Sequence, residues 1–297
     1  MKYGIIKVKR AFLYEENGVD VVDEVFFGWS VMWEDEGEWI EVWTHYGYRG
    51  MERNLIEEKS REWMEEREEA GNTYVVTRGF ADVMRGARVQ ARMLETLGRG
   101  CFVEKMEETE NGYCRVKLAN GVSGFVPEVA LRKRLDSDRF LWGKSEERFF
   151  VEQGIPEGWS EEKFRRKVVE CAKGYLGCQY RWGGKAADGI DCSGVVFMVY
   201  LMNGVLIWRD ADIREGYPMK AIWREGEEMC LVEERAKAGD LLFWRGHVGM
   251  YLGDGRYLHC TGHERVFGCR VNSLQRGDAD FRKDLAEALK VVGSVFS

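Results

Sequence analysis

The stretch Asp188-Gly-Ile-Asp-Cys-Ser-Gly194, followed by the apolar run Val195 to Asn203, decides the fold of the second half of this chain. The glycine-rich entry and the terminal Gly204 favour a buried helix over a strand, with Cys192 in its first turn. A helix N-terminus lowers the pKa of a thiol and supplies backbone N–H groups for an oxyanion hole. The pattern therefore predicts a reactive thiolate at Cys192, whereas a lone Cys beside Ser and Gly would more often be structural.

Three strands are predicted downstream, each apolar and bounded by turn residues: Ala238–Trp244, His247–Gly253 and Arg256–Cys260. A three-residue loop, Gly253 to Gly255, would pair Tyr251 with Tyr257 in the hairpin between the last two strands. His247 and His259 would then be diagonal neighbours on one face of the sheet. A two-residue loop would put them on opposite faces, so a catalytic triad predicts the longer loop.

These residues suggest an acyl-transfer mechanism. Cys192 would attack a carbonyl carbon, and His247 would take the thiol proton and later protonate the leaving amine. His259 would orient His247 and fix its tautomer, although a polar residue at a strand end is an equally simple interpretation. The other two histidines, His45 and His263, are expected on the surface. No cofactor is implied, because a nucleophile and a base suffice.

Composition narrows the class of protein. The 297 residues are 45% apolar and 32% charged, as in soluble globular proteins, and the net charge of −7 argues against a nucleic-acid partner. No stretch approaches the roughly 18 apolar residues of a membrane span, so no membrane partner is expected. Charges interrupt the first ten residues, which argues against a signal peptide and for a cytoplasmic location if Met1 is the natural start. Eight cysteines without a CxxC pair, and only four histidines, predict reduced thiols and no metal site.

The N-terminal half contains an internal repeat at an offset of 74 residues. Trp39-Ile-Glu-Val42 aligns with Tyr113-Cys-Arg-Val116, and Gly47-Tyr-Arg-Gly50 aligns with Gly121-Val-Ser-Gly124. Short alternating runs between glycines and acidic turns predict small β-barrels made of hairpins, and the pattern resembles bacterial SH3-like domains. One irregular β-domain is the alternative. The charged run from Glu57 to Ala70 is predicted to be an exposed helix between the barrels, and a further helix is expected from about Ser160 to Tyr175.

The segments GCQYRWGG, GIDCSGVVFMVY, AGDLLFW and HVGMYLGDGRYLH, with the order Cys, His, His, resemble the NlpC/P60 family of cell-wall cysteine peptidases over roughly residues 165 to 275. The resemblance implies an α+β fold, with a papain-like catalytic domain preceded by two small SH3-like β-barrels. The expected parts of the chain, in order, are barrel 1 at 1–56, a helical linker at 57–72, barrel 2 at 73–135, a linker at 136–158 and the catalytic domain at 159–297.

The combination with SH3-like domains looks like the subgroup that hydrolyses γ-D-glutamyl-diamino acid bonds in peptidoglycan-derived peptides with a free N-terminal L-Ala. Carried over by motif, the substrate-binding residues would be Tyr180, Asp191, Ser193 and Asp210, with Glu24 and Tyr48 (or Tyr46) from the first barrel. Two carboxylates, Asp191 and Asp210, could pair with the terminal ammonium. An amidase or acyltransferase, or a non-catalytic wall-peptide-binding protein, are the alternatives. The protein is expected to act as a monomer.

The family pattern is not matched everywhere. The usual Pro-Arg-Asp-Ser segment is Trp208-Arg-Asp-Ala211 here, so a hydrogen bond from that serine is lost. The segment Gly177-Cys-Gln-Tyr180 stands where a proline usually precedes the motif tyrosine, and Cys178 supplies no obvious chemistry.

Overall fold

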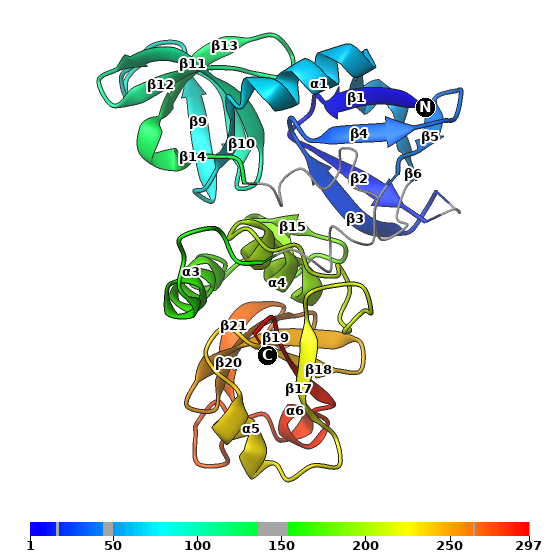
Figure 1. Ribbon diagram of the computed structural model, residues 1–297, viewed down its shortest axis with the longest axis vertical. Coiled ribbons are helices and arrows are strands. Elements are labelled where there is room, and N and C mark those ends of the chain that lie inside the picture. Colours follow the sequence, from blue (N-terminus) through cyan, green and yellow to red (C-terminus); the bar gives the residue numbers. More distant parts are fainter. Residues whose placement is uncertain (16–17, 44–49, 136–153, 264, 297) are drawn as a thin grey trace. The chain divides into compact units, whose positions relative to one another are not determined.

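The computed structural model describes residues 1–15, 18–43, 50–135, 154–263 and 265–296. The chain divides into two compact units, Met1–Ser145 and Glu146–Ser297 (Figure 1). Unit 1 is built mainly of short strands, and unit 2 combines a sheet with helices. The fold is therefore mixed α/β, with many strands and few helices.

Two sheets make up the first half of unit 1. The first has the strand order β4-β1-β7, formed by β1 (Lys2–Ile6), β4 (Ser30–Trp33) and β7 (Ile56–Lys59). The second has the order β3-β2-β6-β5, formed by β2 (Arg10–Tyr14), β3 (Val21–Phe26), β5 (Trp39–Glu41) and β6 (Gly50–Glu52). Trp29 and Trp33 are fully buried and fill the core of this half.

One seven-stranded sheet makes up the second half of unit 1, in the order β10-β9-β13-β12-β11-β8-β14. Its strands are β8 (Thr73–Val76), β9 (Phe80–Met84), β10 (Met93–Gly98), β11 (Phe102–Glu110), β12 (Tyr113–Lys117), β13 (Ser123–Pro127) and β14 (Leu131–Lys133). Both members of the sequence repeat form antiparallel pairs, but with registers that differ by one residue: Trp39 of β5 pairs with Glu52 of β6, and Tyr113 of β12 pairs with Pro127 of β13. Among the described strands, no pairing joins the first and last strands of a sheet into a closed barrel, so the SH3-like assignment stays a prediction.

Helix α1 (Arg61–Ala70) joins the two halves, and it differs from the prediction of an exposed helix starting at Glu57. Residues 56–59 instead extend the first sheet as β7, which pairs with β1. The helix begins after Ser60, whose hydroxyl accepts a hydrogen bond from the Trp63 N–H. Its inner face is buried, because Met64 is fully covered and the Arg67 guanidinium donates to the Gly28 carbonyl at 2.9 Å.

An antiparallel six-stranded sheet forms the frame of unit 2, in the order β17-β22-β18-β19-β20-β21. Its strands are β17 (Lys220–Arg224), β18 (Leu241–Trp244), β19 (His247–Gly253), β20 (Arg256–Thr261), β21 (Gly268–Ser273) and β22 (Val291–Ser294). A two-stranded ribbon, β15 (Lys185–Ala186) and β16 (Gly189–Ile190), leads into the helix that carries Cys192.

Helices α3 (Glu161–Lys173) and α4 (Cys192–Leu201) pack on each other and on β19 (Figure 1). Both were predicted, α3 with Ser160 as its N-cap and α4 as a wholly buried helix, and both predictions are confirmed. A second apolar cluster, which includes Trp223, Tyr251 and Tyr257, packs with residues of the short helices α5 (Cys230–Arg235) and α6 (Lys283–Glu287). Helices α3 and α4 thus cover the sheet at β19, and α5 and α6 contribute to its second apolar cluster.

The β19–β20 hairpin has the predicted register with a different loop. Tyr251 pairs with Tyr257 as expected, but Gly253 pairs with Arg256, so the turn has two residues. Both turn residues, Asp254 and Gly255, have positive φ, as a tight hairpin turn requires. The prediction of a three-residue loop is therefore wrong. A β-bulge between Tyr251 and Gly253 supplies the extra residue and keeps the histidines on one face.

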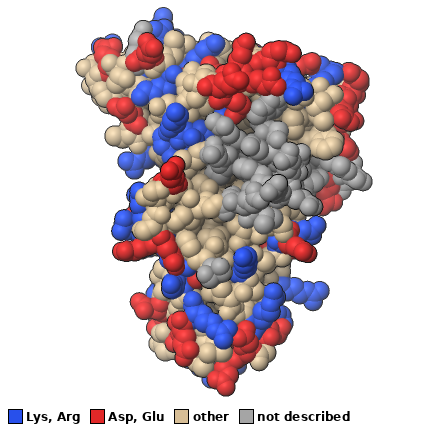
Figure 2. Space-filling model, viewed as in Figure 1, with Lys and Arg blue, Asp and Glu red and all other residues tan. Residues whose placement is uncertain are grey.

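Charged side chains of both signs are mixed over the face shown in Figure 2, and acidic ones gather over α1. A single basic surface of the kind that binds nucleic acid is not seen on that face. Among the described residues, none of the helices has the length and apolar character to cross a membrane.

Candidate active site

The N-terminus of α4 is fixed by Asp191, which caps the helix. The Asp191 carboxylate accepts a hydrogen bond of 2.5 Å from the Gly194 N–H. Gly194 has to be glycine, because a Cβ there would lie 2.1 Å from the Gly184 carbonyl oxygen. These contacts hold the first turn of α4 against the ribbon that precedes it, so the position of Cys192 is defined by local packing.

The Cys192 thiol lies at this helix end and is 8% exposed. Burial raises the pKa of the Cys192 thiol to about 12, and the nearby Asp191 carboxylate adds to this shift. The backbone N–H groups of Val248 and Ser193 act in the opposite direction by hydrogen bonding to the sulfur. The sequence predicts a lowered thiol pKa from the helix end alone; in the structure, the removal of water outweighs that effect, and the resting thiol is protonated.

A chain of hydrogen bonds connects His247, His259 and Asn272 on three adjacent strands, β19, β20 and β21. His247 Nε2 lies 2.7 Å from His259 Nδ1, and His259 Nε2 lies 3.0 Å from Asn272 Oδ1. The Asn272 amide nitrogen donates to the Asp280 carbonyl at 2.7 Å, which fixes the orientation of the amide. Asn272 was not predicted, because it lies 13 residues beyond His259 on another strand and belongs to no local motif.

This chain determines which imidazole nitrogens carry protons. Asn272 Oδ1 can only accept, so His259 Nε2 carries a proton and donates it. In neutral His259 the Nδ1 atom is then an acceptor, and it takes the hydrogen bond from His247 Nε2–H. His247 therefore keeps an unprotonated Nδ1 atom as its basic position.

Both imidazoles are neutral in the resting site. Burial lowers the pKa of His247 to about 3, and the neighbouring His259 and Arg282 contribute. Burial also lowers the pKa of His259 to about 4, against an opposing effect of the hydrogen bond to Asn272. A neutral thiol beside a neutral imidazole is a general-base arrangement, in which the thiolate forms as the proton moves to His247.

Arg209 is a residue of this site that sequence reasoning missed. Its guanidinium pairs with both oxygens of Asp191, at 3.2 and 3.1 Å, and donates to the Ser193 hydroxyl at 2.7 Å. All three side chains are buried. Asp191 and Ser193, which the sequence assigns to substrate binding, are thus held by Arg209 beneath the nucleophile. The signal was the arginine of the Trp208-Arg-Asp-Ala211 segment, of which only the aspartate was assigned a role.

Tyr180 lies beside the nucleophile. Burial raises the pKa of its phenol, and Cys192 and Asp191 contribute, which puts all three groups within electrostatic range. Its ring packs against Phe267 at a centroid distance of 5.9 Å and against Gly262, where a Cβ would approach the ring to 3.0 Å. The structure therefore brings this predicted residue to the site of Cys192.

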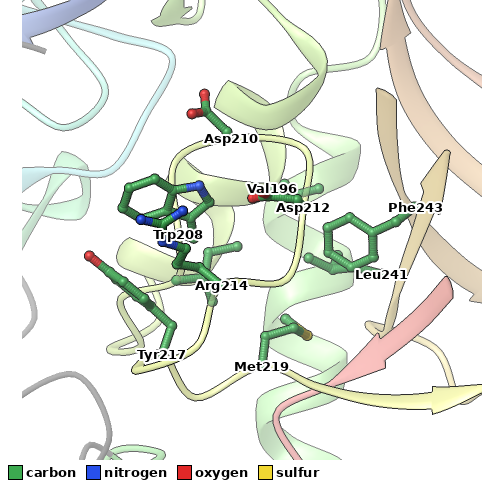
Figure 3. A pocket seen from close by; sticks show the side chains of 10 residues that line it. Val196, Trp208, Asp210, Asp212, Arg214, Tyr217, Met219, Leu241 and Phe243 are labelled. Carbon is green, nitrogen blue, oxygen red and sulfur yellow. The ribbon is translucent and has the colours of Figure 1, made fainter. Parts of the chain in front are cut away.

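A pocket of about 250 Å³, part of it open to solvent, contains Asp210 (Figure 3). Val196, one helical turn after Cys192 on the same side of α4, contributes to its wall. The other residues that line the pocket are both apolar and polar: Ile207, Trp208, Asp212, Arg214, Tyr217, Met219, Leu241 and Phe243. Asp210 thus lines a recess that lies one turn of α4 from the nucleophile.

The two residues expected from the first barrel have no established relation to this site. Glu24 lies in β3 as a fully buried carboxylate, 3.4 Å from the Arg10 Nε atom. Tyr48, the alternative Tyr46 and His45 lie outside the described residues. His263 is exposed, as expected.

Comparison with known proteins identifies the family. Residues 177–278, which contain Cys192, His247, His259 and Asn272, match the profile of the NlpC/P60 family. A protein of Lysinibacillus sphaericus named dipeptidyl-peptidase 6 is 33% identical over 98% of this chain and 99% of its own length. The chain belongs to the NlpC/P60 family. Members of this family are cysteine peptidases, and this chain is an enzyme of that class.

Further relatives of this NlpC/P60 protein agree. The γ-D-glutamyl-L-lysine dipeptidyl-peptidase of Bacillus subtilis is 36% identical over 37% of this chain and 37% of its own length. An NlpC/P60 protein structure from Bacillus cereus superposes with a TM-score of 0.71 at 16% identity, over 99% of this chain and 100% of the other. At that identity the similarity shows the fold alone, and it extends to both units.

Proposed function

We propose that this enzyme hydrolyses the γ-D-glutamyl-diamino acid bond of peptidoglycan-derived peptides that carry a free N-terminal L-Ala, with Cys192 as nucleophile and His247 as general base. The observation that carries the proposal is the hydrogen-bond chain from His247 through His259 to Asn272, which leaves a basic nitrogen on His247. His247 begins β19, the strand that packs on α4, and the N–H of the next residue, Val248, hydrogen-bonds to the Cys192 sulfur. The nucleophile and the base that acyl transfer needs are thereby present as a protonated thiol and a neutral imidazole.

The reaction starts with proton transfer from the Cys192 thiol to His247 Nδ1, as the sulfur attacks the amide carbonyl carbon. The imidazolium then protonates the nitrogen of the scissile amide, and the diamino acid leaves as a free amine. The acyl group remains on Cys192 as a thioester. Water attacks the thioester with His247 again acting as base, which releases the acyl portion and restores the thiol.

The first turn of α4 supports the oxyanion of each tetrahedral intermediate. The first N–H groups of a helix have no partner within the helix, and those of Cys192 and Ser193 lie at the open end of α4. The partial positive charge of a helix N-terminus favours the developing negative charge at that place. The Ser193 N–H also hydrogen-bonds to the sulfur and, together with the Val248 N–H, favours the thiolate while it forms.

Recognition of a free amine is assigned to Asp210. A dipeptidyl-peptidase, as two relatives are named, removes two residues from a free amino terminus, so its site needs a partner for an ammonium group. Asp191 is a poor partner, because both of its oxygens are engaged by Arg209. Asp210 lines the same pocket as Val196, which lies one helical turn from Cys192, and an extended dipeptide spans at most about 7 Å.

The substrate assignment also includes unit 1. We propose that its two halves are SH3-like domains, since both members of the repeat of 74 residues form antiparallel pairs, β5 with β6 and β12 with β13, with registers that differ by one residue. Glu24 and Tyr48 stay candidates for substrate contacts from the first half. The enzyme is proposed to act as a monomer on soluble peptides.

The substrate assignment is tested with four peptides: L-Ala-γ-D-Glu linked to diaminopimelate or to lysine, each with a free or an acetylated N-terminus. The wild-type enzyme should release the diamino acid only from the free-amine peptides. Asp210→Asn should lower kcat/KM on them by about 10- to 100-fold, as expected for loss of a charged hydrogen bond. Asp254→Asn, in the exposed hairpin turn, is the matched control and should leave kcat/KM unchanged.

Other results would change the assignment. Equal cleavage of the free and acetylated peptides would retain the peptidase but contradict the role of Asp210. Cleavage of an acyl–amino acid bond elsewhere in the peptide would favour the amidase alternative.

A further inference from the structure

Two cysteines that the mechanism does not use face each other beside the active site. Cys260, in β20, is the direct cross-strand partner of Cys269, in β21. All eight cysteines are free thiols, and these two are buried, at 0% and 4% exposure. Cys260 directly follows His259, so the pair is attached to the strand that orients the catalytic base.

The backbone identifies the type of pair. The Cys269 N–H donates to the Cys178 carbonyl at 2.9 Å, and the Cys269 carbonyl accepts from the Gly177 N–H at 3.0 Å. Both backbone groups of Cys269 therefore point away from β20. Cys260 and Cys269 form a non-hydrogen-bonded antiparallel pair, in which the Cα atoms lie about 4.5 Å apart.

That geometry suits a disulfide without movement of the strands. Disulfide-linked cysteines have Cα separations of about 4.4–6.8 Å, which includes the value for this type of pair. The two thiols also affect each other's ionisation, because the neighbouring Cys269 raises the pKa of Cys260. The Cys260 sulfur in turn donates to the Ile190 carbonyl at 3.0 Å.

We propose that Cys260 and Cys269 form a reversible disulfide and that this disulfide lowers the catalytic rate. With hydrogen peroxide as oxidant, the Cys269 thiolate attacks one peroxide oxygen, giving a sulfenic acid and, after protonation, water. The Cys260 thiol then attacks the sulfenic sulfur, and the sulfur–sulfur bond forms as a second water leaves. Two thiols are oxidised by two electrons, and one peroxide is reduced to two waters. Cys269 reacts first because it retains some exposure, whereas Cys260 has none.

The effect on rate follows from the Ile190 contact. Ile190 lies two residues before Cys192, and its carbonyl is tied to β20 by the Cys260 S–H donor. A disulfide has no S–H, so oxidation removes this tie between the strand of His259 and the entry to α4. Loss of one hydrogen bond in the frame that aligns Cys192 with His247 should lower kcat by about three- to tenfold. Reduction with a dithiol restores the thiols and the rate.

The disulfide is tested by mass, which does not depend on the substrate proposed above. The full chain carrying Cys192→Ala, so that the nucleophile cannot react, is treated with peroxide and digested without reduction. The expected product is one peptide pair joined through Cys260 and Cys269, about 2 Da lighter than the sum of the two. The control chain Cys192→Ala/Cys269→Ala should not form it. Both cysteines recovered as free thiols, or Cys260 joined to Cys178 instead, would overturn the proposal.

The rate is tested on the proposed peptide substrate, and this arm rests on the proposed function. Wild type and Cys269→Ala are oxidised and then treated with arsenite, which reduces a sulfenic acid at Cys192 and leaves disulfides intact. Wild type should keep a three- to tenfold loss in kcat that only dithiothreitol reverses, as estimated above for one hydrogen bond. Cys269→Ala should recover fully with arsenite. If mass spectrometry detects the disulfide but kcat does not fall, the proposal that the disulfide lowers the rate is overturned. If neither wild type nor Cys269→Ala cleaves the peptide in the reduced state, the result counts against the proposed function alone.

Discussion

His247 Nε2 lies 2.7 Å from His259 Nδ1, and because His259 donates its other ring proton to Asn272, His247 can only be the donor in this contact. The unprotonated ring nitrogen of His247 is therefore Nδ1. In the proposed triad the third residue, His259, is a neutral imidazole rather than a carboxylate. Its contribution is to fix the tautomer and orientation of His247, and a positive charge on His247 gains no anionic partner from it.

Replacing His259 should reduce the rate through His247. His259→Ala leaves His247 free to rotate and to adopt either tautomer, so kcat should fall by about 100-fold, part of the 10²–10⁴ that a positioned general base supplies. Asn272→Ala should cost about tenfold, the equivalent of one hydrogen bond. Nitrogen chemical shifts of His247 should report one tautomer in wild type and a mixture in His259→Ala.

His263→Ala is the control for these variants, because this histidine is exposed and follows His259 closely in the chain. Its kcat should equal that of wild type. A His259→Ala enzyme with wild-type kcat and a single His247 tautomer would contradict the assigned role.

Removing Arg209 should destabilise the protein more than removing the whole ion pair. Arg209→Met leaves the buried Asp191 carboxylate without its counter-charge, and breaking a buried pair costs about 3–5 kcal/mol. Asp191→Asn/Arg209→Met removes both charges and should recover part of that free energy of unfolding. Urea unfolding of the three proteins measures the difference.

The matched control is Arg181→Met, which removes an arginine from the more exposed pair with Asp188. Its free energy of unfolding should change by less than about 1 kcal/mol. If Arg209→Met and Arg181→Met were equally stable, the ion pair beneath Cys192 would not hold the helix end.

The resting enzyme should contain no thiolate–imidazolium pair. Burial raises the pKa of Cys192 to about 12 and lowers that of His247 to about 3, so near pH 7 both groups are neutral. The difference in absorbance at about 240 nm between wild type and Cys192→Ala should be absent near pH 7 and rise only in alkaline solution. A thiolate signal that persists to about pH 5 would show a preformed ion pair.

Stability should fall in acid because of the buried histidines. The pKa of His259 is about 4 in the folded protein, below the usual value of 6.5, so the unfolded chain binds a proton that the folded one does not. The free energy of unfolding should therefore decrease as pH falls from 6.5 towards 4, by about 1.4 kcal/mol per pH unit for each such group. His259→Gln should show a smaller decrease than wild type over this range in urea unfolding, whereas His263→Gln should show the same decrease. Parallel curves for wild type and His259→Gln would contradict a buried neutral His259.

Local patterns were enough to predict the elements that carry the nucleophile and the base. Ser160 caps the start of α3, and the Gly-rich entry to Cys192 marks α4. The register of the β19–β20 hairpin was also predictable, because only one pairing puts His247 and His259 on one face. Its loop was not, because a β-bulge leaves no distinctive residue in a sequence.

Long-range partners were beyond the sequence. Asn272 and Arg209 become part of the site only when separate strands and loops meet, and each looks like an ordinary polar residue in its own segment. The pKa of Cys192 was mispredicted for the same reason, since the sequence shows the helix end but not how little water reaches it. In unit 1, the first part of the charged run became β7 because it pairs with β1, which comes 50 residues earlier in the chain.

The most direct test of the account is the release of the diamino acid from L-Ala-γ-D-Glu-diaminopimelate, followed by mass spectrometry for wild type, Cys192→Ala and Cys230→Ala. Cys230 is exposed at the start of α5 and serves as the control thiol. Wild type and Cys230→Ala should release the diamino acid at equal rates, and Cys192→Ala should release none. Equal release by Cys192→Ala would contradict the assignment of Cys192 as the nucleophile.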